Sequence, residues 1–184
     1  MIPLKRLKLT AAALIYMTAS AGCHAIDLKG TIWEKAVAPS VEPSLLYAVA
    51  LVETRKARAD GMAAPRPYVL RIGSSVHEFS SYDEASKHLA EIIGQGVNPL
   101  LIDIGMMQIN PKWHSHRVEH LSDLLIPSIA IRVASEILTE AMNTTDNLVI
   151  GVGRYHSYRP DKAQRYGRDV IQIACKIGWK NQTC

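Results

Sequence analysis

The sequence predicts a mostly α-helical (α+β) single domain that carries a small β-hairpin as an insertion. Apolar runs long enough for helices occupy residues 43–55 and 126–142, and a helix start signal precedes residues 82–94. Residues 61–80 instead combine glycines and prolines with two short runs typical of a hairpin. The chain has 184 residues, enough for one domain with a hydrophobic core after its first 25 are set aside.

Residues 1–25 have the pattern of a secretory signal peptide, in which a basic cluster at residues 5–8 precedes an uncharged apolar stretch. That stretch is shorter than the roughly 20 residues that a membrane-spanning helix needs. We therefore expect export to the periplasm, cleavage after Ala25 and a mature domain at residues 26–184. The four residues that end at Cys23 partly resemble a lipoprotein signal, and lipidation there would attach the chain to a membrane.

The first helices of the mature part are predicted on either side of a proline-containing break. Residues 33–37 predict a short helical turn. Pro43 suits the first turn of the next helix, because its missing N–H and its fixed φ are tolerated there. Residues 43–55 are apolar on nearly every face until Glu53, so we expect this helix at the centre of the core.

Residues 61–100 are interpreted as an insertion made of the hairpin and the helix that follows it. Residues 68–72 and 76–79 are the two expected strands, separated by a glycine-serine turn. After the hairpin, Ser81 and Glu84 have the spacing of a capping box, in which the two side chains satisfy free backbone N–H groups at a helix start. The pattern predicts a helix immediately after the hairpin.

Three further segments complete the predicted secondary structure. The helix after the hairpin is expected over residues 82–94, where glycine ends it. Another helix is expected over residues 126–142. Residues 148–156 could form a helix or a buried strand, since a short apolar run does not distinguish the two. No internal repeat or linker interrupts the sequence, so residues 26–184 are expected to form one domain.

Charge and cysteine content limit the partners and the compartment. The sequence has 21 basic and 17 acidic side chains, but three basic ones lie in residues 1–25, so residues 26–184 carry a net charge of +1. A nearly neutral domain lacks the basic surface with which proteins bind nucleic acid. Cys175 and Cys184 could form a disulfide in an oxidising compartment or remain two thiols, since spacing alone does not establish their geometry.

Two motifs point to a catalytic site. Glu53 ends the apolar helix, and Gly-Met-Met-Gln-Ile-Asn follows at residues 105–110. With Gly-Arg-Tyr-His-Ser at residues 153–157, these segments resemble the family 1 soluble lytic transglycosylases, which share the goose-type lysozyme fold. The resemblance covers roughly residues 33–166. The hairpin, the helix after it and Ile-Asp-Ile-Gly at residues 102–105 are similar to the branch that accompanies conjugative pili and type IV secretion systems.

The resemblance implies cleavage of the β-1,4 bond between N-acetylmuramic acid and N-acetylglucosamine in peptidoglycan. Glu53 would give a proton to the glycosidic oxygen and then accept the proton of the sugar's own 6-hydroxyl, leaving a 1,6-anhydromuramoyl end. Ordinary glycosidases use a second carboxylate, which the family lacks. An acid near neutral pH needs a raised pKa, which burial beside apolar side chains can cause. The resemblance implies neither a cofactor nor a metal.

The resemblance also assigns a set of substrate-binding residues, which line the saccharide cleft, shape its tight turn or stack near the catalytic carboxyl. This set comprises Thr54, Gly105, Met107, Gln108, Asn110 and Tyr155. Each has an ordinary structural interpretation as well, and Trp113 is equally suited to a sugar face or to the core. The chain departs from the family at Thr54, where serine is usual, and in the third motif, where His156 and Ser157 receive no role.

The sequence leaves three alternatives. A hydrolytic muramidase would use Glu53 but release reducing ends, and a non-catalytic peptidoglycan-binding assembly factor would bind glycan without cutting it. His-Arg-Val-Glu-His at residues 116–120 matches the pattern of zinc peptidases, in which His116 and His120 would bind the metal. Pro111 lies too close for the long helix which that pattern requires. The resemblance implies that the partners are peptidoglycan strands, with components of a pilus or secretion system as possible further partners.

Overall fold

The computed structural model describes residues 25–57 and 63–184, so the predicted signal peptide lies outside the described residues apart from Ala25. Its helices are α1 (Ile32–Ala36), α2 (Pro43–Thr54), α3 (Tyr82–Gly94), α4 (Pro111–His114), α5 (Pro127–Met142), α6 (Leu148–Gly153) and α7 (Pro160–Lys176). The strands are β1 (Lys56–Ala57), β2 (Ala63–Ala64), β3 (Val69–Ile72), β4 (Ser75–Glu78) and β5 (Ile102–Ile104), and the 3₁₀ turns are η1 (Pro99–Leu101), η2 (Ser115–Arg117) and η3 (Leu121–Leu125). The prediction of a mostly α-helical domain with a small β-hairpin is confirmed.

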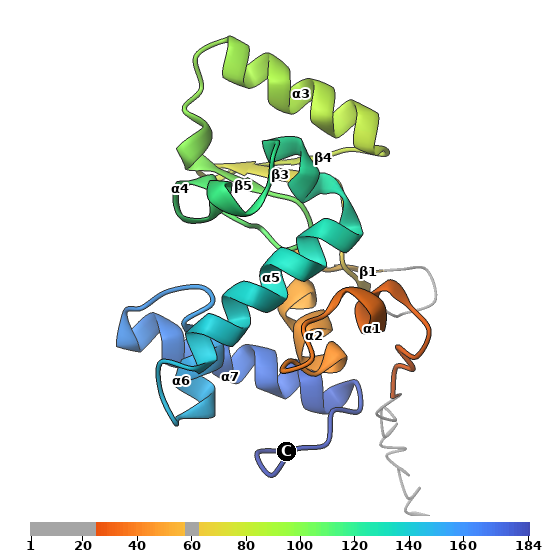
Figure 1. The fold of residues 1–184 in the computed structure, drawn as a ribbon, viewed down its shortest axis with the longest axis vertical. Helices are drawn as coiled ribbons and strands as arrows, with labels where there is room; N and C mark the ends of the chain where they lie inside the picture. The colour runs from red at the N-terminus through yellow and green to blue at the C-terminus, as the bar shows by residue number, and fades with distance from the viewer. Residues whose placement is uncertain (1–24, 58–62) are drawn as a thin grey trace, which may run out of the picture.

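Helix α5 connects two parts of the molecule (Figure 1). The sheet of β3, β4 and β5 lies at one end together with α3, and helices α2, α6 and α7 gather at the other. α5 packs against α1, α2 and α6 and also against η3, which lies near the sheet. Among the described residues, no helix is both long and apolar enough to cross a membrane.

Helix α2 occupies the centre of the core, as its apolar sequence predicts. Pro43 stands in its first turn, and the helix packs against α7, α5 and α1. Because neighbours enclose the helix on several sides, its buried side chains are not confined to one stripe. These are Leu45, Leu46, Ala48, Val49, Ala50, Leu51 and Thr54.

The predicted hairpin and the helix after it are present, together with a third strand that was not predicted, while residues 61 and 62 of the predicted insertion lie outside the described residues. β3 and β4 form the antiparallel hairpin, and α3 begins after Ser81, whose hydroxyl accepts a hydrogen bond from the N–H of Glu84 at 3.3 Å. β5 pairs antiparallel with the other edge of β3, so that Arg71 lies opposite Asp103. A three-residue strand has too little sequence pattern to identify by itself, and only its pairing with β3 defines it.

Helices α6 and α7 cross at a distance that only glycine allows. Residues 148–156, for which the sequence left helix and strand open, contain the helix α6. The next helix, α7, was not predicted. A Cβ atom on Gly153 would lie 1.8 Å from the carbonyl oxygen of Ala163, and one on Gly167 would lie 1.9 Å from that of Val149. The two glycines therefore let the backbones of α6 and α7 touch.

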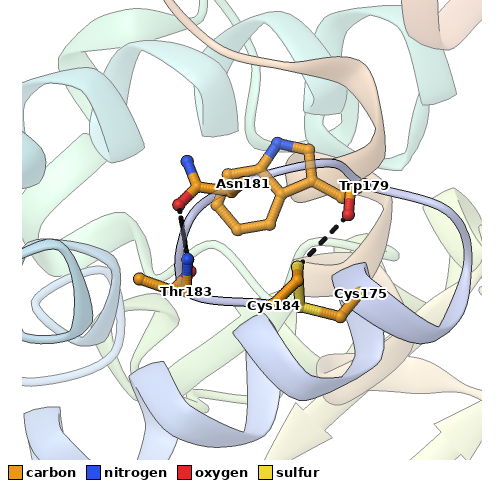
Figure 2. Close-up of a disulfide and its surroundings, with 5 residues drawn as sticks. All are labelled: Cys175, Trp179, Asn181, Thr183 and Cys184. Carbon is orange, nitrogen blue, oxygen red and sulfur yellow. Dashed lines mark hydrogen bonds between the residues drawn. A yellow bond between two sulfur atoms is a disulfide. The ribbon is translucent and has the colours of Figure 1, made fainter.

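The C-terminal segment is tied back onto the end of α7. Cys175 in α7 and Cys184 at the end of the chain are joined by a disulfide (Figure 2). The N–H of Ile26 donates to the carbonyl oxygen of Ile177 at 2.9 Å. The start of the described chain thus lies beside the end of α7.

Candidate active site

A cleft of about 270 Å³ collects side chains from segments far apart in the sequence. Glu53 comes from the end of α2, Arg71 from β3 and Asp103 from β5. The remaining lining residues follow β5, belong to α4 and α5, or follow α6; they are Gln108, Ile109, Asn110, Trp113, His114, Ile137, Tyr155 and His156. The cleft therefore lies where the sheet end of the molecule meets its helical end.

Glu53 has the environment that an acid catalyst needs. Its Oε1 accepts a hydrogen bond of 2.6 Å from the hydroxyl of Tyr166. Burial raises the pKa of Glu53 from 4.5 to about 7, and the nearby carboxylate of Asp103 also raises it. The Tyr166 hydrogen bond and the positive charge of Arg71 lower it and so oppose the effect of burial. Near neutral pH the carboxyl group of Glu53 thus exists in both protonation states.

Tyr166 is the main contact of Glu53 that sequence analysis missed. It lies on α7, 113 residues beyond Glu53, and the ring of His156 stacks on it at 4.9 Å with an interplanar angle of 6°. Burial raises the pKa of Tyr166 well above its ordinary value, so its hydroxyl stays protonated and donates to Glu53. The apolar spacing of α7, with Ala163, Tyr166, Val170 and Ala174 buried, is the signal that would have placed this tyrosine on an inward face.

The turn at residues 105–110 contains two residues with a positive φ, Gly105 and Gln108. Gly105 has φ of +74°, and a Cβ atom there would lie 2.2 Å from the carbonyl oxygen of Leu124. Gln108 also has a positive φ, of 46°, and its Nε2 donates to the carbonyl oxygen of Gly105 at 2.8 Å. Its Oε1 is buried and has no hydrogen-bond partner among the described residues. That oxygen is thus an unpaired acceptor on a residue that lines the cleft.

Asn110 and Tyr155 also lie where the cleft is formed. Asn110 Nδ2 donates to Asp103 Oδ1 at 2.8 Å, and its own Oδ1 caps α4 by accepting from the N–H of Lys112. The hydroxyl of Tyr155 donates to the carbonyl oxygen of Met107 at 2.9 Å. Both residues therefore line the cleft while also connecting it to the segment that contains Gln108.

Three predicted substrate-binding residues do not line the cleft: Gly105, which shapes the turn, and Thr54 and Met107. The side chain of Met107 is fully buried in the core, and only its carbonyl oxygen contacts a cleft residue, Tyr155. Thr54 is also buried; its hydroxyl lies 3.0 Å from the carbonyl oxygen of Met106 and accepts from the N–H of Arg66. The side chains of Thr54 and Met107 do not line the cleft because the last turn of α2 packs against the 105–110 turn, and their contact with substrate stays a prediction.

The histidines at 116 and 120 lack the helix that a zinc peptidase motif requires. η2 ends at Arg117, and η3 begins only at Leu121, so no helical turn relates His116 to His120. Within residues 25–57 and 63–184, no three side chains of the metal-binding types come together. Trp113, which the sequence assigned equally to core and surface, is 65% exposed and lines the cleft.

A comparison of the chain with models of known protein families identifies its family. A family model described as the Transglycosylase SLT domain matches residues 30–166, a range that begins just before α1 and ends at Tyr166. Neither the curated proteins nor the solved structures gave a match to the chain. The matched range covers well over half of the chain and contains both partners of the hydrogen bond between Tyr166 and Glu53. The chain therefore belongs to the Transglycosylase SLT domain family and is a lytic transglycosylase, a lyase that acts on peptidoglycan.

Proposed function

We propose that Glu53 is both the acid and the base in cleavage of the β-1,4 bond between N-acetylmuramic acid and N-acetylglucosamine. The proposal rests on one observation, a carboxyl group in the cleft that accepts a hydrogen bond from Tyr166 and has a pKa of about 7. Such a group can donate a proton and later take one up at the same pH. Gln108, Asn110 and Tyr155 are proposed to hold the glycan around it.

The proposed reaction consumes no water. The bond between C1 of the muramoyl residue and the glycosidic oxygen breaks, and that oxygen receives the proton of Glu53. The 6-hydroxyl oxygen of the same muramoyl residue then bonds to C1, and its proton passes to the Glu53 carboxylate. Glu53 is thus restored, and the products are a free 4-hydroxyl group and a 1,6-anhydromuramoyl end. Arg71 stabilises the carboxylate form between the two proton transfers.

The pH dependence of cleavage tests the role of Glu53 as the acid. We expect kcat/KM to fall as the pH rises through about 7, because ionised Glu53 has no proton to donate. Tyr166→Phe removes a hydrogen bond that lowers this pKa, so the fall should move to higher pH. Tyr82→Phe on α3 is the control and should leave the profile unchanged. A profile of Tyr166→Phe that stays in place, or moves to lower pH, would contradict the proposed role of the tyrosine hydroxyl.

A hydrolytic muramidase is the second candidate, and Asp103 is the observation that favours it. Asp103 places a second carboxylate in the same cleft as Glu53, and glycosidases that use water need such a group. Its Oδ1 accepts from Asn110, and its strand position lies opposite Arg71. We assign Asp103 to these contacts rather than to activation of water, so the anhydro product remains our prediction.

Mass spectrometry of digested peptidoglycan separates the two candidates, because an anhydro end is lighter than a reducing end by one water molecule. We expect anhydro ends from the wild type and the same kind of end, in lower yield, from Asp103→Asn. The exposed Asp83→Asn on α3 should match the wild type in both respects. Reducing ends that disappear in Asp103→Asn would instead establish hydrolysis with Asp103 as its base. Peptidoglycan that binds but yields no product from any variant would favour the assembly factor.

We also propose that the protein works in the periplasm and opens the wall locally for a conjugative pilus or a type IV secretion system. The charge pattern of residues 1–25 supports export, and the disulfide between Cys175 and Cys184 suits an oxidising compartment. The hairpin and α3, which resemble the branch with such partners, support the secretion role. Lipidation of Cys23 would add attachment to a membrane.

A further inference from the structure

We propose that the outer face of α7 and the loop after it bind the surface of a lipid bilayer that contains anionic phospholipid. We call this surface the basic face; it comprises the exposed residues Arg165, Arg168, Gln172, Lys176 and Lys180. It lies at the end of the molecule opposite α3 (Figure 1) and includes no residue of the catalytic cleft. The inference goes beyond the proposed function, because it concerns where the enzyme is held rather than what it cuts.

Positive charge is concentrated in the C-terminal part of the sequence. Residues 159–184 contain six basic and two acidic side chains, which gives a net charge of +4. Residues 26–158 contain twelve basic and fifteen acidic side chains, which gives −3. The nearly neutral total therefore conceals two parts of opposite charge, and the positive part is the one that contains α7.

The turns of α7 place its basic side chains away from the core. Arg165, Arg168, Gln172 and Lys176 follow one another at intervals of three or four residues, the spacing of a single helix face. The buried residues of α7 occupy the opposite face. In the described part of the chain, no carboxylate forms an ion pair with Arg165, Arg168 or Lys180. Their charges are therefore available to an anion outside the protein.

A pocket at the edge of the basic face has the composition that a phospholipid headgroup needs. Its volume is about 410 Å³, and none of the described residues that line it is acidic. Arg168, Lys176 and Thr183 offer N–H and O–H donors for a phosphate group. Val149 and Ile171 offer apolar contact for the glycerol and the first acyl carbons. The carboxylates of an acidic protein would leave this apolar part uncovered, so a lipid is the better match.

The start of the described chain lies at the same end of α7. A Cβ atom on Gly178 would lie 2.8 Å from the Cβ of Ala25, so the two residues are in close contact. The predicted signal peptide thus joins the domain within a few residues of Lys176 and Lys180 along the neighbouring loop. A signal peptide, or a lipid on Cys23, would hold this end at a bilayer during the proposed export. The basic face would then meet the lipid surface without a change of orientation.

Binding in this orientation would set the cleft between the bilayer and the cell wall. The inner face of α7 carries Tyr166, which donates to Glu53, while the outer face would lie on the lipid. The sheet and α3 lie at the other end of the molecule and would point away from the bilayer (Figure 1). One helix would thus connect the membrane contact to the catalytic carboxyl group.

Partition into vesicles tests the proposal. The full chain is exported with Cys23→Ser, which prevents lipidation, and the purified protein is mixed with vesicles of pure phosphatidylcholine or of equal parts phosphatidylcholine and phosphatidylglycerol. We expect about 10²-fold stronger partition into the anionic vesicles, since each basic side chain near such a surface contributes about fivefold. The preference should weaken as salt is added, because salt screens exposed charges.

Single substitutions locate the contact. Arg168→Gln and Lys180→Gln should each weaken partition into the anionic vesicles by about fivefold. Lys87→Gln is the matched control, because it removes the same charge from an exposed position on α3 at the other end of the molecule. Thermal unfolding and peptidoglycan cleavage should be the same in all three variants, since none of these side chains lines the cleft.

Two results would overturn the proposal. One is equal partition of the protein into both kinds of vesicle, or an equal loss in Lys87→Gln and Arg168→Gln. The other is binding to soluble polyglutamate without binding to anionic vesicles, which would assign the basic face to an acidic protein partner. Partition is measured without cleavage, so its outcome is independent of the chemistry proposed for Glu53.

Discussion

Glu53→Gln is expected to lower the rate of peptidoglycan cleavage by about 10²–10⁴-fold, the usual loss when a general acid or base is removed. Glutamine has the shape of glutamate, and its amide oxygen can still accept the hydrogen bond from Tyr166. It has no proton to give to the glycosidic oxygen and cannot take one from the 6-hydroxyl group. The release of anhydromuropeptides with time, measured by mass spectrometry, gives the rate.

The stability of Glu53→Gln separates a chemical effect from unfolding. The pKa of Glu53 is about 7 in the folded state against an ordinary 4.5, so the folded state retains a proton that the unfolded state has lost. Wild-type stability therefore falls as the pH rises from 4.5 to 7, and glutamine avoids this loss. At pH 8 the variant should unfold at the same temperature as the wild type or at a higher one. Glu91→Gln, exposed on α3, is the matched control, and activity in Glu53→Gln close to that of this control would refute the assignment.

Gly167→Ala is expected to destabilise the protein by more than about 2 kcal/mol, because it forces a methyl group into a backbone contact. The added Cβ would lie 1.9 Å from the carbonyl oxygen of Val149, and backbone cannot rotate away as a side chain does. Helices α6 and α7 would have to separate, which would also displace the neighbouring Tyr166 from Glu53. Denaturant unfolding should show the loss of stability, and cleavage should decline with it.

Gly94→Ala is the control for this prediction. Gly94 lies in the last turn of α3, and a Cβ atom there would have nothing within 4 Å. Alanine has the higher helix propensity, so the variant should be as stable as the wild type or more stable by up to about 1 kcal/mol. If Gly167→Ala unfolded at the same denaturant concentration as Gly94→Ala, the close approach of α6 and α7 would be refuted.

Local sequence signals predicted the elements that depend on nearby residues. The range 82–94 agrees with α3 at both ends, since Ser81 caps the helix through a bond within its own first turn. Helix α2 was predicted because its apolar residues are continuous, and Glu53 stood out as the charge that ends it. Gly105 was assigned to a tight turn because glycine readily adopts a positive φ, a conformation that few other residues adopt, and its φ is indeed positive.

The sequence by itself determined the class of the fold, the helices with strong local signals and the identity of Glu53 as the proposed acid. Only the tertiary structure decided what surrounds that carboxyl group. Tyr166 and Asp103 come from α7 and β5, whose places depend on packing against α6 and on pairing with β3. Tertiary packing also buried Met107, which the sequence had assigned to the cleft. A raised pKa and a cleft arise from distances between remote segments, and such distances are set by the packed core rather than by any local pattern.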